Sequence, residues 1–220
     1  MGCKASFLAV TAFTLVSAVD AQTSTAGISL QAPSSVMVGN PLAVAVNISG
    51  VNNLFAFQVG LMFPPATIAA ESTSGGQFLP GYFVPGQIDG TNGVIAAVAG
   101  AEIGMVAGVS GNGTLCTIQF MPTAIGSATI SIPISSVILL DSNLNEIPFT
   151  VTGSTVSVTA NLCDIDNAGT VTVTDVQAVI NEAFGSASPS NDLNGDGEVN
   201  VVDVQLDVDA ALGLGCSAAA

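Results

Sequence analysis

The chain reads DLNGDGEVNVVD at residues 192–203 and DIDNAGTVTVTD at residues 164–175, so one twelve-residue pattern occurs twice, 28 residues apart. Oxygen ligands at positions 1, 3, 5, 7, 9 and 12 of such a loop converge on one hard cation. Gly169 and Gly197 occupy position 6, where glycine permits the sharp turn. The repeat predicts two calcium loops, and the competing interpretation is an acidic surface loop with several Asp and Asn.

The two copies differ in the completeness of their ligand sets. The second copy is nearly complete, whereas the first has Ala168 at position 5, where a ligand is expected. We therefore predict one strong calcium site in the second loop and one weakened site in the first.

The first 21 residues have the features of a signal peptide. Lys4 is followed by an apolar run at residues 5–19, and small residues precede a cleavage point before Gln22. The start MGCKAS also fits N-myristoylation, with Cys3 as a second acyl site, but that interpretation leaves the apolar run unexplained. We predict a secreted protein, extracellular or on the cell surface, without a membrane anchor.

Acidic residues dominate the charge of the chain. Lys4 is its one basic side chain, against 16 Asp and Glu, and it contains no His. Such a chain is a poor partner for nucleic acids and anionic membranes, because it has nothing to neutralise phosphates. Most of the carboxylates follow residue 160, where only a bound metal offsets their repulsion. They are Asp164, Asp166, Asp175, Glu182, Asp192, Asp196, Glu198, Asp203, Asp207 and Asp209.

The pattern of apolar residues changes after residue 159. Residues 27–159 show short alternating segments separated by Gly, Pro, Asn and Ser, which predicts an antiparallel β-sandwich. Helical periodicity then appears at residues 175–184 and 203–212, with Thr172 and Asn200 as caps. Each helix is expected to end at a glycine, Gly185 or Gly213. The predicted packing faces are Val176, Val179, Ile180, Ala183 and Phe184, and Val204, Val208, Ala211 and Leu212.

Two cysteines flank the repeated unit. If its halves pack as a pair, Cys163 and Cys216 come close, and a disulfide closing about 54 residues stabilises the unit by about 4 kcal/mol. The alternative is two free thiols. Cys116 alternates with Thr114 and Ile118 on a predicted strand, so we expect it to fill space in the core.

Residues 164–213, a tandem loop and helix without the helix that normally precedes a calcium loop, resemble a type I-like dockerin module. Residues 27–159 resemble a cohesin module, although LMFPP at residues 61–65 departs from its usual pattern. The cohesin-like segments are VG at 38–39 before residues 42–48, SGVNNLFAFQ at 49–58 and VILLDSNLNEIP at 137–148.

The resemblance implies an all-β jelly-roll sandwich followed by a small all-α calcium-binding module. It also implies that these modules bind each other, as in cellulosome-type assemblies. The expected divisions are 1–21 signal peptide, 22–26 N-terminal segment, 27–159 cohesin-like sandwich, 160–162 linker, 163–216 dockerin-like module and 217–220 tail.

The resemblance further assigns residues to Ca²⁺ and to a partner. The ligands of the second site would be Asp192, Asn194, Asp196, the Glu198 carbonyl, Asn200 through water and Asp203. Those of the weaker site would be Asp164, Asp166, the Thr170 carbonyl, Thr172 through water and Asp175. The partner-binding positions fall on Val173, Thr174, Ile180, Asn181, Val201, Val202, Val208 and Asp209. The alternative is that these valines only pack the two helices together.

Three classes of function follow for comparison. The first is a secreted calcium-dependent scaffolding protein that pairs with cohesin or dockerin modules of the same or other proteins, including head-to-tail homopolymers. The second is a carbohydrate-binding accessory protein of a polysaccharide-degrading system, although the chain has no Trp and only one Tyr, Tyr82, near Phe78 and Phe83. An enzyme is the least favoured, because without His the acid and base candidates are carboxylates such as Asp141 and Glu146.

Overall fold

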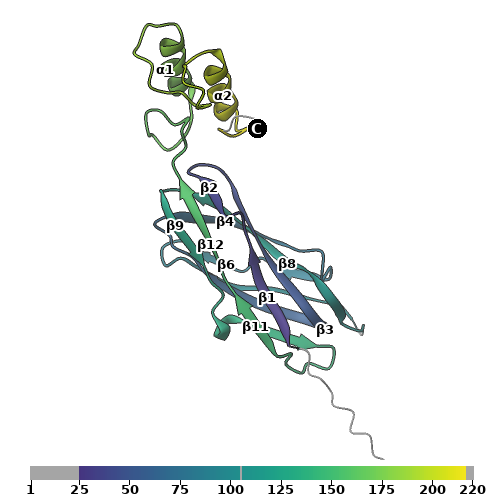
Figure 1. Cartoon of the computed structure of the whole chain (residues 1–220). Coiled ribbons are helices and arrows are strands. Elements are labelled where there is room, and N and C mark those ends of the chain that lie inside the picture. The colour runs from purple at the N-terminus through teal and green to yellow at the C-terminus, as the bar shows by residue number, and fades with distance from the viewer. Residues whose placement is uncertain (1–24, 105, 217–220) are drawn as a thin grey trace, which may run out of the picture.

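The computed structural model describes residues 25–104 and 106–216, and Figure 1 shows a β-sandwich with a pair of helices beyond one of its ends. The predicted signal peptide, residues 22–24 of the N-terminal segment and the 217–220 tail lie outside the described residues. None of the described helices has the length and apolar character needed to cross a membrane.

Residues 26–159 contain the strands, with one short 3-10 helix, η1 (Ile134–Ser136). The strands are β1 (Ala26–Gln31), β2 (Ser35–Met37), β3 (Leu42–Met62), β4 (Ile68–Gly75), β5 (Tyr82–Val84), β6 (Gln87–Asp89), β7 (Val94–Ala101), β8 (Val109–Pro122), β9 (Gly126–Ile130), β10 (Ile138–Asp141), β11 (Phe149–Thr152) and β12 (Ser154–Thr159).

The long strand β3 belongs to both layers of the sandwich. Its first half pairs with β1 and β8, and its second half pairs with β7 and β10. The register with β8 shifts twice between Ile48 and Leu54, where Gly50 and Asn53 have φ of 64° and 61°. Such bulges bend a strand and increase its twist. These pairs form one nine-stranded sheet, in which one part runs β11-β1-β3-β8-β4 and the other contains β10, β3, β7, β5 and β6. Strands β2, β12 and β9 form a separate three-stranded sheet in the order β2-β12-β9.

Most strand pairs are antiparallel, as predicted, but two are not. Strand β1 pairs with β11, and β2 with β12, in parallel. The antiparallel pairing predicted for the sandwich therefore holds for most strand pairs and fails at these two. Parallel neighbours need long crossover connections, and here most of the sandwich separates the two members of each pair in sequence.

Alternating residues of the strands fill the space between the layers. In β3, Leu42, Val44, Val46 and Ile48 are buried, while the residues between them face outward or are half-buried. Cys116 is fully buried in this core, as predicted, and burial raises the pKa of its thiol to about 12. It is an inert space-filling residue, because the thiolate is the reactive form.

Both helices begin with the capping residues that the sequence predicts. Helix α1 (Val173–Ala183) has Thr172 as its N-cap and α2 (Val201–Ala211) has Asn200, each in a capping box. They therefore begin two residues earlier than expected. Gly185 and Gly213, which follow their C-terminal ends, have φ of 72° and 77°, a conformation that glycine adopts without strain.

The predicted packing faces of the helices were partly wrong. Phe184 is 83% exposed and Leu212 is 71% exposed, although both were expected to be packed. The position-12 aspartates turn inward to their loops, so residues three, four or seven positions later share the buried side of each helix. The buried residues are Asp175, Val179 and Glu182 in α1, and Asp203, Leu206 and Asp207 in α2.

A disulfide joins the two ends of the helical unit. Cys163 and Cys216 are both buried, with their Cα atoms 5.8 Å apart and a sequence separation of 53. On the chain-entropy model a loop of this size contributes about 4 kcal/mol to stability. Cys116 is the free cysteine among the described residues.

The three cysteines give a prediction about thiol counts. In the chain from residue 22 onward, a thiol reagent at mildly alkaline pH should titrate no thiol in the native protein and one thiol in denaturant. It should titrate three thiols when the protein is both denatured and reduced. The single thiol released by denaturant should disappear in Cys116→Ala. A reactive thiol in the native protein, or three thiols in denaturant before reduction, would contradict this assignment.

Candidate calcium loops and docking surfaces

The first loop brings its acidic side chains together. Oxygen atoms of Asp164, Asp166 and Asp175 all lie within 4.8 Å of one another. The Asp164 carboxylate also accepts hydrogen bonds from the backbone N–H groups of Ala168 and Gly169, both at 2.9 Å. Gly169 has φ of 92°, so the chain makes the turn that position 6 requires.

The second loop makes the same turn, but among the described residues only the first loop brings three acidic oxygens within 4.8 Å of one another. The Asp192 carboxylate accepts hydrogen bonds from the N–H groups of Gly195 at 2.8 Å and Gly197 at 2.7 Å, and Gly197 has φ of 95°. Asn194 donates to Asp196 at 2.9 Å, and this hydrogen bond is the main cause that holds the pKa of Asp196 below its usual value. Asn194 and Asn200, two of the predicted ligands of the second loop, are amides rather than carboxylates.

The aspartate at position 12 ties each loop to its helix. Asp175 accepts from the N–H groups of Asp166 and Thr172, at 3.1 and 2.8 Å. Asp203 accepts in the same way from Leu193 and Asn200, both at 2.8 Å. Burial opposes ionisation of Asp175, but these backbone donors hold its pKa below the usual value, so it stays a carboxylate at neutral pH.

The donor set of both loops suits Ca²⁺. Carboxylate, amide and carbonyl oxygens are the ligands of this hard cation, and the described part of the helical unit offers no basic side chain that competes for the carboxylates. The residues that would hold the ions are those predicted from the sequence, with Ala168 exposed and contributing only its backbone.

The proposed partner-binding residues divide by exposure. Val173 is 79% exposed, Val201 is 76% exposed and Val202 is exposed, while Ile180 and Val208 are half-buried. We refer to Val173, Val201 and Val202 as the helix-start valines. Their exposure contradicts the alternative that they pack the helices together. An apolar side chain with this exposure is available to a partner.

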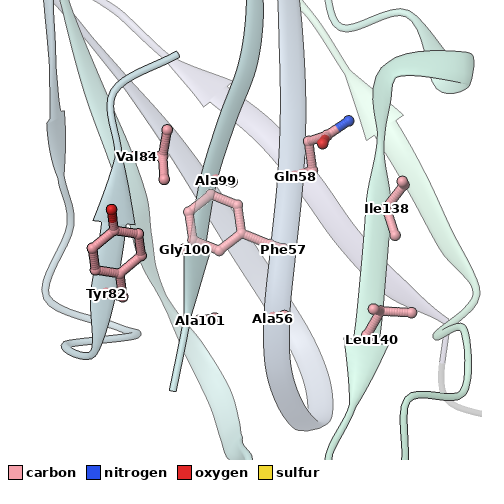
Figure 2. Close-up of a pocket in the computed structure, with 10 residues that line it drawn as sticks. All are labelled: Ala56, Phe57, Gln58, Tyr82, Val84, Ala99, Gly100, Ala101, Ile138 and Leu140. Atoms are coloured by element: carbon pink, nitrogen blue, oxygen red, sulfur yellow. The ribbon is translucent and has the colours of Figure 1, made fainter. Parts of the chain in front are cut away.

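The sandwich has an apolar groove that the sequence did not reveal. It measures about 250 Å³ and crosses strands β5, β7, β3 and β10 (Figure 2). Gly100 is necessary beneath it, because a Cβ there would collide with the Phe57 ring. None of the lining residues is charged. They are Ala56, Phe57, Gln58, Tyr82, Val84, Ala99, Gly100, Ala101, Ile138 and Leu140.

One sequence signal for this groove existed. Ile138 and Leu140 lie on the groove side of β10 while Leu139, between them, is buried in the core. A strand that is apolar on both faces indicates that both faces meet other groups. Tyr82 lies in strand β5 and is 63% exposed, whereas Phe78 and Phe83 pack against the core.

Two carboxylates of the sandwich, Asp141 and Asp89, stabilise turns. Asp141 accepts hydrogen bonds from the N–H groups of Asn143 and Asn145, both at 2.8 Å, and these bonds, the one from Asn145 above all, lower its pKa. Asp89 is engaged in the same way by Asn92 and Thr91. A carboxylate held ionised by its own turn is a poor general acid.

The sandwich has the fold of cohesin modules. It is similar to a non-cellulosomal cohesin from the hyperthermophilic archaeon Archaeoglobus fulgidus, with a TM-score of 0.51, 19% identity and coverage of 62% of this chain and 92% of that one. It is also similar to a type II cohesin domain from the cellulosome of Acetivibrio cellulolyticus, with a TM-score of 0.53, 16% identity and coverage of 60% and 95%.

A third similar structure is the sixth cohesin of Acetivibrio cellulolyticus scaffoldin B, in complex with a mutant Cel5 dockerin. The TM-score is 0.52 at 19% identity, with 61% of this chain and 99% of that one covered. The covered share of this chain corresponds in size to the sandwich alone. No protein-family model matches the chain, and no curated protein does.

Proposed function

We propose that this is an exported, calcium-dependent scaffolding protein that joins protein modules through the groove of its sandwich and the helix-start valines of its helical unit. The observation that carries the proposal is the uncharged apolar groove on the open sheet of a cohesin-fold sandwich. Exposed apolar surface rimmed by polar residues is typical of protein interaction sites.

The helical unit supplies a surface that complements this groove. Its tandem loops and capped helices resemble a dockerin, and similar cohesin structures are complexes with dockerins. Both surfaces are uncharged in a chain that has no basic residue after Lys4. Their contact would rest on apolar burial with little electrostatic steering, and it avoids the repulsion that carboxylates elsewhere on the chain would cause.

The presence of both surfaces on one chain favours self-assembly. A groove that binds the helix-start valines of the next copy makes a contact between two different surfaces. Such a heterologous contact closes into a ring or continues as an open filament. We propose the homopolymer as one form of the assembly, alongside pairing with cohesin or dockerin modules of other exported proteins.

Carbohydrate binding is the weaker candidate. Sugar-binding surfaces use flat aromatic rings, and Tyr82 is the single exposed aromatic residue that lines the groove. Association with polysaccharide would therefore come through a partner. Catalysis is not proposed, because the turn-forming Asp89 and Asp141 have their oxygens engaged by neighbouring amides.

Calorimetric titration of the two halves tests the proposal directly. Residues 22–160 and 161–220 should bind each other when Ca²⁺ is present and fail to bind in excess chelator, because the loops hold the helix starts in place. The matched control is the 22–160 half with Ile138→Asp, which places a charge in the groove and should abolish the heat. If the unmodified halves show no binding with Ca²⁺, the two surfaces are not complementary and the homopolymer is excluded.

A further inference from the structure

Asp207 is a buried carboxylate without a hydrogen-bond partner. It is fully buried in α2, and neither of its carboxylate oxygens has a partner among the described residues. The other buried carboxylates of the helical unit are all well bonded; for example, Glu182 accepts from Ser190 and Asn191 through both backbone and side-chain donors. Burying a carboxylate without a partner costs stability, so this position requires an explanation.

Packing does not require a carboxylate at this position. Asp207 comes 28 residues after Val179, so the first repeat has a fully buried valine where the second has the aspartate. Helices α1 and α2 pack against each other, and each places this position on its buried side. A valine would therefore fit the interface, and the negative charge is what the second repeat adds.

The charge of Asp207 acts on the first loop. Burial, and after it the negative charge of Asp175, raise the pKa of Asp207 to about 6. Asp175 is the position-12 residue of the first loop and lies within 4.8 Å of the oxygens of Asp164 and Asp166. In the described part of the helical unit no basic side chain offsets either this cluster or Asp207, and a bound cation is the available counter-charge.

We propose that Asp207, reaching across from the second repeat, is a positioning residue for Ca²⁺ in the first loop and compensates for the ligand missing at Ala168. Asp207 is not one of the three residues whose oxygens converge, so it acts through its charge on Asp175. Without the ion its repulsion destabilises the helix pair, and binding of the ion relieves that repulsion. The inference rests on the proposed calcium function of the loops.

The inference also couples the two sites. Asp203, the position-12 residue of the second loop, lies one helical turn before Asp207 on α2. The second loop fixes the start of this helix, and the helix then places the carboxylate that supports the first loop. The first repeat gives the second loop no equivalent support, because the position on α1 that corresponds to Asp207 is the uncharged Val179.

Isothermal titration of Ca²⁺ into the metal-stripped chain from residue 22 tests the proposal with Asp207→Asn. We expect two ions in the wild type, and in D207N one of the two sites should weaken roughly tenfold, as for other residues outside the direct ligand set. In excess chelator, D207N should also retain more helical circular dichroism than the wild type, because the buried negative charge is gone. The matched control is E71Q, which removes an exposed charge of the sandwich outside both loops and both proposed contact surfaces, and should change affinity less than twofold.

The affected site is identified with Asp164→Ala, which disables the first loop. In that background D207N should leave the remaining Ca²⁺ affinity unchanged. Equal affinities in D207N and wild type, or a loss in the D164A background, would overturn the role of Asp207. If the wild type binds no Ca²⁺, the calcium function itself fails, which is a separate result. Should D207N not fold, Asp207→Val, which restores the residue of the first repeat, serves in its place.

Discussion

With Ca²⁺ present, the chain from residue 22 onward is expected to elute as assemblies of many copies, and excess chelator should convert them to monomers. The groove and the helix-start valines are different surfaces, so each copy can bind one neighbour at each end. Size-exclusion chromatography with light scattering measures the mass in both conditions.

Two blocking variants make this prediction specific. Ile138→Asp places a charge in the groove, and the triple change of Val173, Val201 and Val202 to Asp removes the apolar helix starts. Aspartate in the first helical turn is compatible with the helix dipole, so the triple variant should keep its helices. Each variant alone should be monomeric, because a buried unpaired charge at a contact costs several kcal/mol.

Mixing the two variants should give dimers of one copy of each. The valines of the first variant still fit the groove of the second, but no further copy can add to either end. Matched controls with exposed changes away from both surfaces, such as Ile125→Asp, should still assemble. A monomeric wild type in Ca²⁺ would exclude the homopolymer, and dimers formed by either variant alone would show that another surface is used.

Removal of Ca²⁺ is expected to unfold the helical unit while the sandwich stays folded. The sandwich has a large continuous core, whereas among the described residues of the helical unit the buried apolar side chains are Val179, Leu206 and the two bonded cysteines. Units with so small a core depend on metals and disulfides. An ion at about 1,000 times its Kd contributes about 4 kcal/mol, which is comparable with the whole stability of such a unit.

Circular dichroism and calorimetry separate the two parts. Chelator should remove the helical signal and leave one thermal transition, that of the sandwich. Asp192→Ala, in the more complete loop, should lose helix at a Ca²⁺ concentration at which Asp164→Ala keeps it. Asp89→Asn, which alters a sandwich turn, should behave as wild type toward chelator. Full retention of the helical signal without Ca²⁺ would show that the disulfide and the small core suffice.

Features set by short-range spacing were predictable from the sequence. The caps Thr172 and Asn200, the turns at Gly169 and Gly197, and the change from strands to helices at residue 160 all depend on neighbouring residues. The buried faces of the helices were less predictable. Apolar residues occur on several sides of both helices, and the inward turn of the position-12 aspartates, rather than the number of apolar residues, decides which side is buried.

The sequence by itself determined the repeated oxygen-rich loops, their helices and the cohesin-like strand pattern, because each depends on residues within one turn or one strand. The tertiary structure alone decided the groove, since its lining comes from β3, β5, β7 and β10, which are far apart in the chain. It also decided the burial of Asp207 in the helix pair. Both features arise from contacts between segments that are distant in sequence. The spacing of residues within one segment does not determine which distant segments pack against it.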